Sequence, residues 1–147
     1  EQGHHRYAGY VEALMEADIK IKGMQVIWID TEEVGHMKED AGWILRRLQG
    51  CTACVCYNDE VATKLVAVCL EQGIRVPEDL SIIGIDDSDL ANYCEVPLTS
   101  AKNPVRDLGK IAALEMLEMM KGMPVPKVTE LDPEIVNRNS VRLRDGF

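Results

Sequence analysis

The chain has 147 residues, of which 46% are hydrophobic, and its formal net charge is −9. This length and composition suit one globular domain with a core of ordinary size. The negative charge disfavours a nucleic-acid surface on this chain, because such surfaces neutralise phosphates with Lys and Arg. With no run near the roughly 18 apolar residues of a membrane span and no charged-then-apolar leader, we expect a cytoplasmic protein without membrane contact.

Apolar spacing predicts helices that alternate with strands through the first part of the chain. The side chains from Arg6 to Ala17 follow helical spacing, and residues 25–29 (QVIWI) are typical of a buried strand. The same patterns predict helices at 36–48 and 58–72 and strands at 53–57 and 81–85. Strands of this kind between helices indicate a parallel sheet. The predicted fold class is α/β, an open parallel sheet with helices on both faces.

The pattern changes after Asp86. We expect a short polar turn, a strand at 98–101, a long helix at 105–121 and two extended pieces at 127–131 and 135–141. The helix at 105–121 is apolar around much of its circumference, so it needs cover on more than one side.

Five cysteines stand mostly within apolar runs: Cys51, Cys54, Cys56, Cys69 and Cys94. The odd number favours reduced thiols that pack as small hydrophobic side chains. Cys51 and Cys54 have the CxxC spacing of zinc and redox sites, but no second ligand pair follows at finger-like spacing. We therefore favour a buried strand over a metal or redox site, and we expect no metal and no cofactor.

Polar residues stand just beyond the ends of three of the predicted strands. They are Thr31, Asn58 and Asp86. Ligands of open parallel sheets bind outside the carboxyl ends of the strands. An ionised Asp can accept hydrogen bonds from two hydroxyls at once, and an Asn both donates and accepts, so a polyol such as a sugar would suit this set.

Two of these polar residues also have a purely structural interpretation. Asn and Asp cap helices and form turns, and Asn58 and Asp87 both stand where a helix or turn is predicted to begin. Asp86 lies one residue nearer the strand and is harder to explain in this way.

Enzyme signatures are missing from the sequence. It contains no GxSxG, no phosphate-binding glycine loop and no HExxH. Asp86 and Asp87 do not suit a general acid and base pair, because adjacent residues at a strand end point in different directions. We expect no catalytic residue and no enzyme activity.

Several separated motifs stand in a characteristic order along the chain. They are RYAGY at 6–10, YNDEVA at 57–62, VPEDLSIIGIDDS at 76–88, LTS at 98–100, LG at 108–109 with AA at 112–113, and EIVNRNS at 134–140. Together they resemble the effector domain of the LacI/GalR repressor family over nearly the whole chain. YNDE, IDDS and TSAKNP look most like the members that respond to arabinose.

The resemblance implies a fold and a set of binding residues. The fold is a periplasmic-binding-protein-like (type I) sensor subdomain, and residues 1–147 would be the C-terminal part of a sugar-sensing effector domain. The DNA-binding head and the first sensor subdomain are absent from this chain. The implied effector-binding residues are Gln2, Arg6, Asn58, Asp86 and Asn103. Thr31 stands where several relatives place an aromatic ring that stacks on the ligand, which leaves the identity of the sugar open.

The resemblance also implies a function. The parent protein would be a transcriptional repressor that binds a small sugar, L-arabinose or another pentose, and operator DNA through a domain missing here. We expect a homodimer, because the helix at 105–121 packs on the first subdomain in family members and its apolar face is left uncovered in this chain. The alternatives are a periplasmic sugar-binding protein of an ABC transporter, a small α/β enzyme and a structural dimerisation module.

Overall fold

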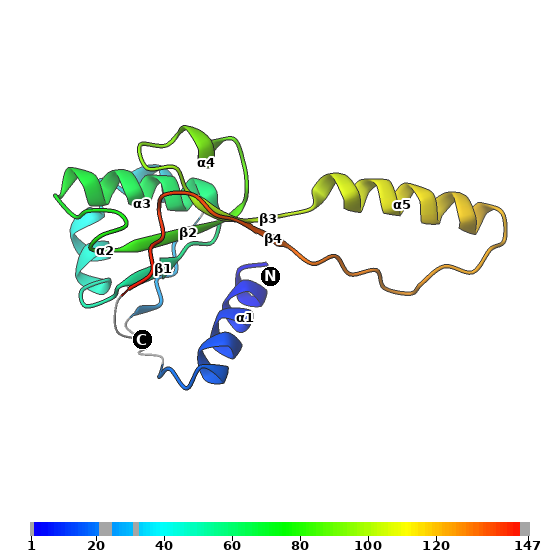
Figure 1. Ribbon diagram of the computed structural model, residues 1–147, viewed down its shortest axis with the longest axis horizontal. Coiled ribbons are helices and arrows are strands. Elements are labelled where there is room, and N and C mark those ends of the chain that lie inside the picture. The colour runs from blue at the N-terminus through cyan, green and yellow to red at the C-terminus, as the bar shows by residue number, and fades with distance from the viewer. Residues whose placement is uncertain (1, 21–24, 31–32, 145–147) are drawn as a thin grey trace.

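A computed structural model describes residues 2–20, 25–30 and 33–144 of the chain (Figure 1). Its helices are α1 (Gln2–Glu16), the 3-10 helix η2 (Glu33–His36), α2 (Ala41–Arg47), α3 (Asp59–Glu71), α4 (Leu90–Tyr93) and α5 (Val105–Met120). Its strands are β1 (Ala53–Val55), β2 (Ser81–Asp86), β3 (Thr99–Lys102) and β4 (Glu134–Val136).

The four strands form one sheet in the order β1-β2-β3-β4. The first three strands are parallel, and β4 is antiparallel to β3. In Figure 1, α3 and α4 lie above this sheet, α2 lies at its left end, and α1 lies below it. The predicted α/β fold with an open sheet is confirmed. The sheet is mixed rather than wholly parallel, because the chain returns from α5 beside β3 in the opposite direction.

Helix α3 covers one face of the sheet and supplies much of the core. Its buried residues include Leu65, Val66 and Cys69. Cys69 lies four residues after Leu65 and three after Val66, so the three side chains share one face of the helix. They pack in one cluster with Ile82 of β2 and Leu98 next to β3. Burying such aliphatic side chains contributes about 1.5 to 3 kcal/mol each to stability.

The ends of α3 follow from its sequence. Asn58 is extended at the N-cap, and its side chain accepts a hydrogen bond from the Val61 amide at 3.0 Å. The first turn contains two acids, Asp59 and Glu60, whose negative charges interact favourably with the positive end of the helix dipole and stabilise the start of α3. Beyond the last turn, Gly73 has φ 74°, a left-handed conformation that glycine adopts without strain.

Three predicted elements differ in the structure. Residues 25–29 do not form a strand: Ile27 and Ile29 pack against the core, but the Val26 carbonyl accepts from the Arg47 side chain at 2.8 Å instead of from a neighbouring strand. The helix expected at 36–48 is shorter: residues 37–40 form a turn after η2, and only α2, from Ala41 to Arg47, is α-helical. The piece expected at 127–131 is not a strand, because it belongs to the return from α5 and lies outside the sheet.

Helix α1 begins four residues before the predicted start and lies against the 25–30 segment. The Trp28 ring lies 5.0 Å from the His4 ring and 5.6 Å from the Tyr7 ring, measured between centroids. None of the residues of α1 is fully buried. Aromatic contacts of this kind therefore hold the start of α1 near the sheet.

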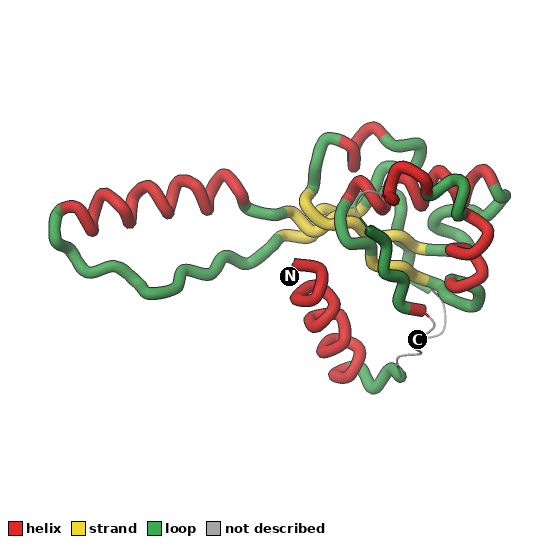
Figure 2. Tube along the Cα trace, turned by 180° about the vertical axis from the view of Figure 1, so that it is seen from behind, coloured by secondary structure: helices red, strands yellow, loops and turns green. Residues whose placement is uncertain are grey.

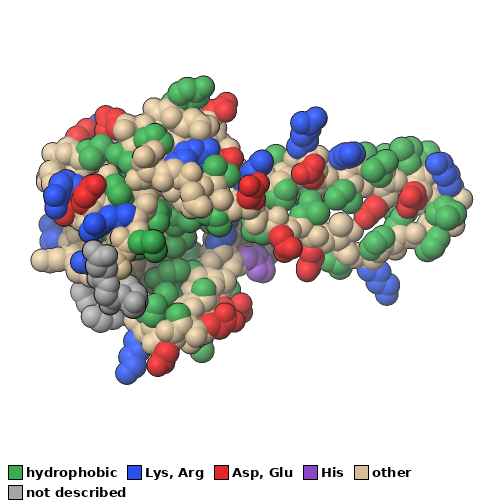
Figure 3. Space-filling model, viewed as in Figure 1, with side chains coloured by type: hydrophobic (Ala, Val, Ile, Leu, Met, Phe, Trp, Pro, Cys, Tyr) green, Lys and Arg blue, Asp and Glu red, His purple; other side chains and the backbone are tan. Residues whose placement is uncertain are grey.

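Helix α5 and the segment after it extend away from the sheet as an arm (Figures 1 and 2). None of the residues of α5 is buried. Apolar side chains are exposed along it, as the space-filling view shows (Figure 3): Leu108, Leu114, Met116, Leu117, Met119 and Met120. No other described segment of the chain covers the apolar side chains of α5, although the sequence pattern predicts that they are buried.

None of the five cysteines forms a disulfide bond. Cys56 and Cys69 are buried, and burial raises the pKa of the Cys69 thiol to about 11. These two thiols therefore pack as small neutral side chains. Among the described residues there is no group of three or more His, Cys, Asp or Glu side chains that could hold a metal ion. None of the helices that the structure describes is long and apolar enough to cross a membrane.

Gly84 in the middle of β2 allows a close approach between the sheet and α3. A Cβ atom at this position would lie 2.7 Å from Leu98 Cδ2 and 3.2 Å from the Asp59 Cα, and it would collide with the Asp59 carboxylate. We expect Gly84→Ala to lower the free energy of unfolding by about 2 to 3 kcal/mol through overpacking. Urea denaturation followed by circular dichroism measures this change.

The matched control for that prediction is Gly9→Ala on the exposed face of α1. A Cβ atom there has nothing within 4 Å, so the substitution should stabilise the helix by up to about 1 kcal/mol. Equal effects of the two substitutions would contradict the role assigned to Gly84.

Candidate functional site

The carboxyl ends of β1, β2 and β3 bring the sequence-predicted residues to one edge of the sheet. Asn58 follows β1, Asp86 ends β2 and Asn103 follows β3. The parallel register pairs Asp86 directly with Lys102, the residue before Asn103. Strand direction alone therefore gathers three polar residues that are far apart in the sequence.

Arg6 reaches this edge from α1. Its Nη2 atom lies 3.4 Å from the Asp86 carboxylate, and its Nη1 atom donates to the Tyr57 carbonyl. The guanidinium carbon also lies 4.4 Å from the centre of the Tyr57 ring, a cation–π distance. Arg6 is thus oriented by an acid, a carbonyl and an aromatic face at the same time.

Gln2 meets the same edge through Tyr57. The Tyr57 hydroxyl donates to Gln2 Oε1 at 3.2 Å. The sequence reasoning did not select Tyr57, although it stands directly before Asn58. An aromatic residue at the end of a strand that leads into a polar edge is the signal that could have identified it.

Asn58 acts as a helix cap, so the structural interpretation of its side-chain oxygen is confirmed. The Oδ1 atom is used by the Val61 amide. Its Nδ2 group makes no hydrogen bond to another described residue. Asn58 therefore still offers donors at the edge while its oxygen fixes the side chain.

Asp86 and Asp87 form an unusual turn at the end of β2. Their φ angles are 110° and 51°, in the left-handed region that residues other than glycine seldom adopt. Each such residue costs about 1 to 3 kcal/mol and persists only where its surroundings enforce it. The two side chains consequently leave the strand in different directions and meet different arginines.

Asp87 does not cap a helix, which corrects the structural interpretation offered from the sequence. Its carboxylate accepts from Arg138 Nη2 at 2.7 Å, and both side chains are 15% exposed. The same guanidinium donates to Asn92 Oδ1 at 3.1 Å and to the Leu98 carbonyl at 2.8 Å. The N-cap position of α4 is taken by Asp89, and Asp87 is paired with Arg138 instead.

Beneath the turn lies a buried polar group that the sequence reasoning missed. The Asp59 carboxylate accepts from the Ser100 hydroxyl at 2.5 Å and from the Ser88 amide at 2.7 Å. Ser100 in turn accepts from the Asp87 amide at 3.1 Å. Asp59 is 1% exposed and Ser100 is fully buried. No signal in the sequence distinguished Asp59 from its polar neighbours Asn58 and Glu60, or Ser100 from Thr99.

A hollow of about 560 Å³ adjoins this edge. Its lining includes Asp86, Asp87 and Asn103 together with the first residues of α5. Asn103 is exposed on it, in the position that the sequence predicts. Thr31 lies outside the described residues. The structure thus brings Gln2, Arg6, Asn58, Asp86 and Asn103 to one edge.

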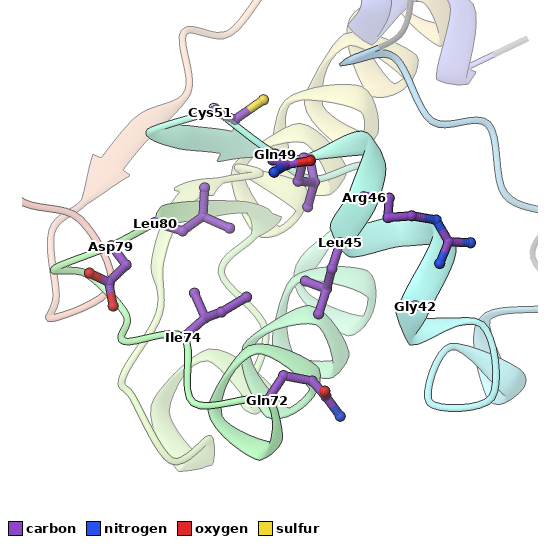
Figure 4. Close-up of a pocket in the computed structure, with 11 residues that line it drawn as sticks. Gly42, Leu45, Arg46, Gln49, Cys51, Gln72, Ile74, Asp79 and Leu80 are labelled. Atoms are coloured by element: carbon purple, nitrogen blue, oxygen red, sulfur yellow. The ribbon is translucent and has the colours of Figure 1, made fainter.

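A second hollow of about 490 Å³ lies at the amino end of the sheet (Figure 4). Leu45, Ile74 and Leu80 form its apolar wall, and Cys51 lies just before β1. None of the predicted site residues lines it. The two hollows occupy opposite ends of the sheet, and only the one at the carboxyl ends is associated with the predicted polar set.

The carboxyl edge presents carboxylate acceptors, amide donors, a guanidinium and an aromatic ring, and Asp86, Asp87 and Asn103 of this edge line the hollow. This combination suits the recognition of a small polar molecule by hydrogen bonds and ring contact. The fold and this edge together define an α/β ligand-binding domain.

The comparisons with known proteins agree with this class. A family described as "Periplasmic binding protein-like domain" matches residues 1–141, and the chain belongs to this family. Its relatives include the repressor CytR of Escherichia coli K12, which is 36% identical over 95% of this chain and 41% of its own length. The arabinose metabolism transcriptional repressor of Geobacillus stearothermophilus is 34% identical over 96% of this chain and 40% of its own length.

Solved structures point to the same group of proteins. The transcription regulator CcpA of Lactococcus lactis superimposes with a TM-score of 0.79 at 31% identity, over 95% of this chain and 51% of that chain. A LacI-family sugar-binding regulator from Escherichia coli, in complex with phosphate, superimposes with a TM-score of 0.80 at 27% identity, over 92% of this chain and 49% of that chain. The resemblance to LacI/GalR repressors is confirmed, and the relatives are repressors rather than enzymes.

The chain spans about 40% of the length of the curated relatives it matches. The arabinose repressor is no more similar to this chain than CytR is, since the identities are 34% and 36%. Overall sequence identity therefore establishes the family but does not distinguish the ligand of one relative from that of another.

The Asp87–Arg138 pair should be essential to the stability of this edge. We expect Arg138→Met to lower the free energy of unfolding by about 2 to 3 kcal/mol, because it leaves the largely buried Asp87 carboxylate without its Arg138 partner. Thermal and urea denaturation measure the loss.

Arg142→Met is the control for that substitution. Arg142 belongs to the same C-terminal segment, but its guanidinium donates only to the exposed Glu78 carbonyl. Its replacement should change stability by less than about 1 kcal/mol. A comparable loss in both variants would contradict a special role for Arg138.

Proposed function

We propose that this chain is the effector-sensing part of a transcriptional repressor, and that it binds a small sugar at the carboxyl edge of its sheet. One observation carries the proposal. Arg6, Asn58 and Asp86 converge on that edge from three separate elements, and Arg6 and Asp86 are in contact there. The repressor relatives support the same conclusion.

The edge suits sugar hydroxyls by its chemistry. In the proposed complex the Asp86 carboxylate accepts from two neighbouring hydroxyls, while Arg6 and the Asn58 amide group donate to ring or hydroxyl oxygens. Gln2 and Asn103 complete the polar lining from either side. We assign Thr31 a place beside the sugar on the resemblance alone.

L-arabinose or another pentose is the proposed effector. The similarity to the arabinose repressor of Geobacillus stearothermophilus supports this choice. A regulator named CelR, 27% identical to this chain, has been solved in complex with cellobiose, which supports a sugar more generally. The motifs YNDE, IDDS and TSAKNP supply the remaining support.

In this function the ligand makes and breaks no covalent bond. It binds one arrangement of the protein more tightly than another, and the shift in population changes the affinity of the whole protein for operator DNA. DNA contacts would come from outside this chain, in agreement with its net charge of −9. Such a repressor acts in the cytoplasm, and the absence of disulfide bonds among the five cysteines supports that compartment over an oxidising one.

A second copy of the chain is the proposed macromolecular partner. The uncovered apolar side chains of α5 support association. We expect the isolated 147-residue chain to form a dimer that buries α5, as measured by multi-angle light scattering at micromolar concentration. A compact monomer under these conditions would show that α5 is covered in some other way.

The sugar assignment is tested by calorimetric titration of the full-length protein with L-arabinose, D-xylose, D-ribose and D-galactose. We expect saturable binding of one sugar to the wild type. Asp86→Asn should lower the affinity for that sugar about tenfold or more, because a hydrogen bond to a charged group is worth about 1.5 to 3 kcal/mol. Asn keeps the shape of the side chain and tolerates a positive φ, so the variant removes chiefly the charge.

Asp89→Asn serves as the control for Asp86→Asn. Asp89 is exposed three residues further on and its side chain makes no capping hydrogen bond. Its affinity should equal that of the wild type. If the folded wild-type protein bound none of the four sugars, the sugar assignment would be wrong.

A further inference from the structure

The orientation of Asp86 depends on a backbone conformation that its own residue type does not favour. Asp86 and Asp87 have consecutive positive φ angles of 110° and 51°. Neither residue is a glycine, so relaxation of the turn would redirect both carboxylates. Something outside the turn must enforce its shape.

The contacts that enforce this shape are hydrogen bonds from the two backbone amides that follow Asp86, those of Asp87 and Ser88. The Asp87 amide donates to Ser100 Oγ at 3.1 Å, and the Ser88 amide donates to Asp59 Oδ2 at 2.7 Å. Ser100 Oγ then donates to Asp59 Oδ1 at 2.5 Å. One carboxylate and one hydroxyl thus fix two successive peptide groups from below.

Neither of these two side chains can reach a ligand at the open edge. Asp59 is 1% exposed and Ser100 is fully buried. Asp59 also starts α3, where the helix dipole favours a negative charge. Gly84 leaves the space that admits the carboxylate against β2. The sheet and α3 are therefore both shaped to place an anion beneath the turn.

We propose, on the basis of the function proposed above, that Asp59 and Ser100 are positioning residues that hold the Asp86 carboxylate in its effector-binding orientation. They act through the Asp87 and Ser88 amides and touch no ligand. The orientation of Asp86 is then set by buried groups on α3 and β3.

Two substitutions weaken this support in different ways. Ser100→Ala removes the acceptor of the Asp87 amide. Asp59→Asn keeps the shape of the side chain but removes its negative charge. If the remaining oxygen accepts from the Ser88 amide, the new amide group can only donate to Ser100 Oγ, so both contacts lose their charge-assisted character. Agreement between the two variants guards against a misleading result from either one.

Ser140→Ala is the matched control. Ser140 is also fully buried, and its hydroxyl likewise joins two groups: it accepts from the Thr99 amide at 2.9 Å and donates to the Ile82 carbonyl at 2.5 Å. These contacts lie within the same sheet but away from the Asp86 turn. Ser140→Ala should therefore cost stability much as Ser100→Ala does, without altering the turn.

The first measurement is calorimetric affinity of the full-length proteins for L-arabinose and the three other sugars named above, with thermal midpoints recorded in parallel. We expect Ser100→Ala and Asp59→Asn to weaken binding by about tenfold, while Ser140→Ala stays within about twofold of the wild type. If all three folded variants bound as tightly as the wild type, or all three lost affinity equally, the positioning role would be refuted.

Hydrogen exchange read out by NMR tests the same inference without any sugar. The Asp87 and Ser88 amides should be protected in the wild type and in Ser140→Ala, and should exchange faster in Ser100→Ala and Asp59→Asn. If no sugar bound the wild type, the sugar assignment would fail, but this pattern would still support the enforced turn. Unprotected amides in the wild type, or unchanged protection in both variants, would overturn it.

Discussion

The structure of the carboxyl edge depends on one buried carboxylate. Asp59 begins α3. Its carboxylate accepts one hydrogen bond from the Ser100 hydroxyl of β3 and another from the Ser88 amide after β2, so it links three parts of the chain at one point. A charge with almost no exposure is tolerable only where donors and a helix dipole compensate it. Both are present here, and Gly84 is the residue that makes room for them. The space beside Gly84 and the hydrogen bonds of Asp59 therefore depend on each other at this edge.

The adjacent acids at the end of β2 divide two tasks between them. Asp87 turns inward to Arg138, with both side chains 15% exposed, and contributes to stability. Asp86 turns to the open edge, where Arg6 is its neighbour and the hollow begins. The left-handed turn sets these two directions. In an extended strand the two side chains would point to opposite faces of the sheet, whereas here one contacts Arg6 at the open edge and the other contacts Arg138. An acid pair that looks redundant in sequence is thus one structural and one accessible group.

Much of this arrangement could be predicted from the amino-acid sequence. Helix α3, its Asn58 cap and its Gly73 stop follow local rules, and the apolar runs of β2 and β3 identify the sheet. Strand direction then suffices to gather Asn58, Asp86 and Asn103. The antiparallel β4, the missing strand at 25–29 and the Asp59–Ser100 contact could not be predicted, because each depends on which distant segment becomes a neighbour. Apolar spacing reports that a segment is buried and does not report its hydrogen-bond partner.

The long arm between β3 and β4 also bears on the order in which the edge forms. Arg138 follows the arm, and its contact with Asp87 spans 51 residues, whereas Asn58 reaches its partner over three. The entropy lost in closing a chain segment grows with its length, so local caps can form early and the Arg138 contact waits for the C-terminal segment to dock. During synthesis, Asp87 therefore gains its Arg138 partner only after the whole arm has been made. A nascent chain that ends within the arm has its sensor residues in sequence but lacks Arg138 to lock Asp87 in place.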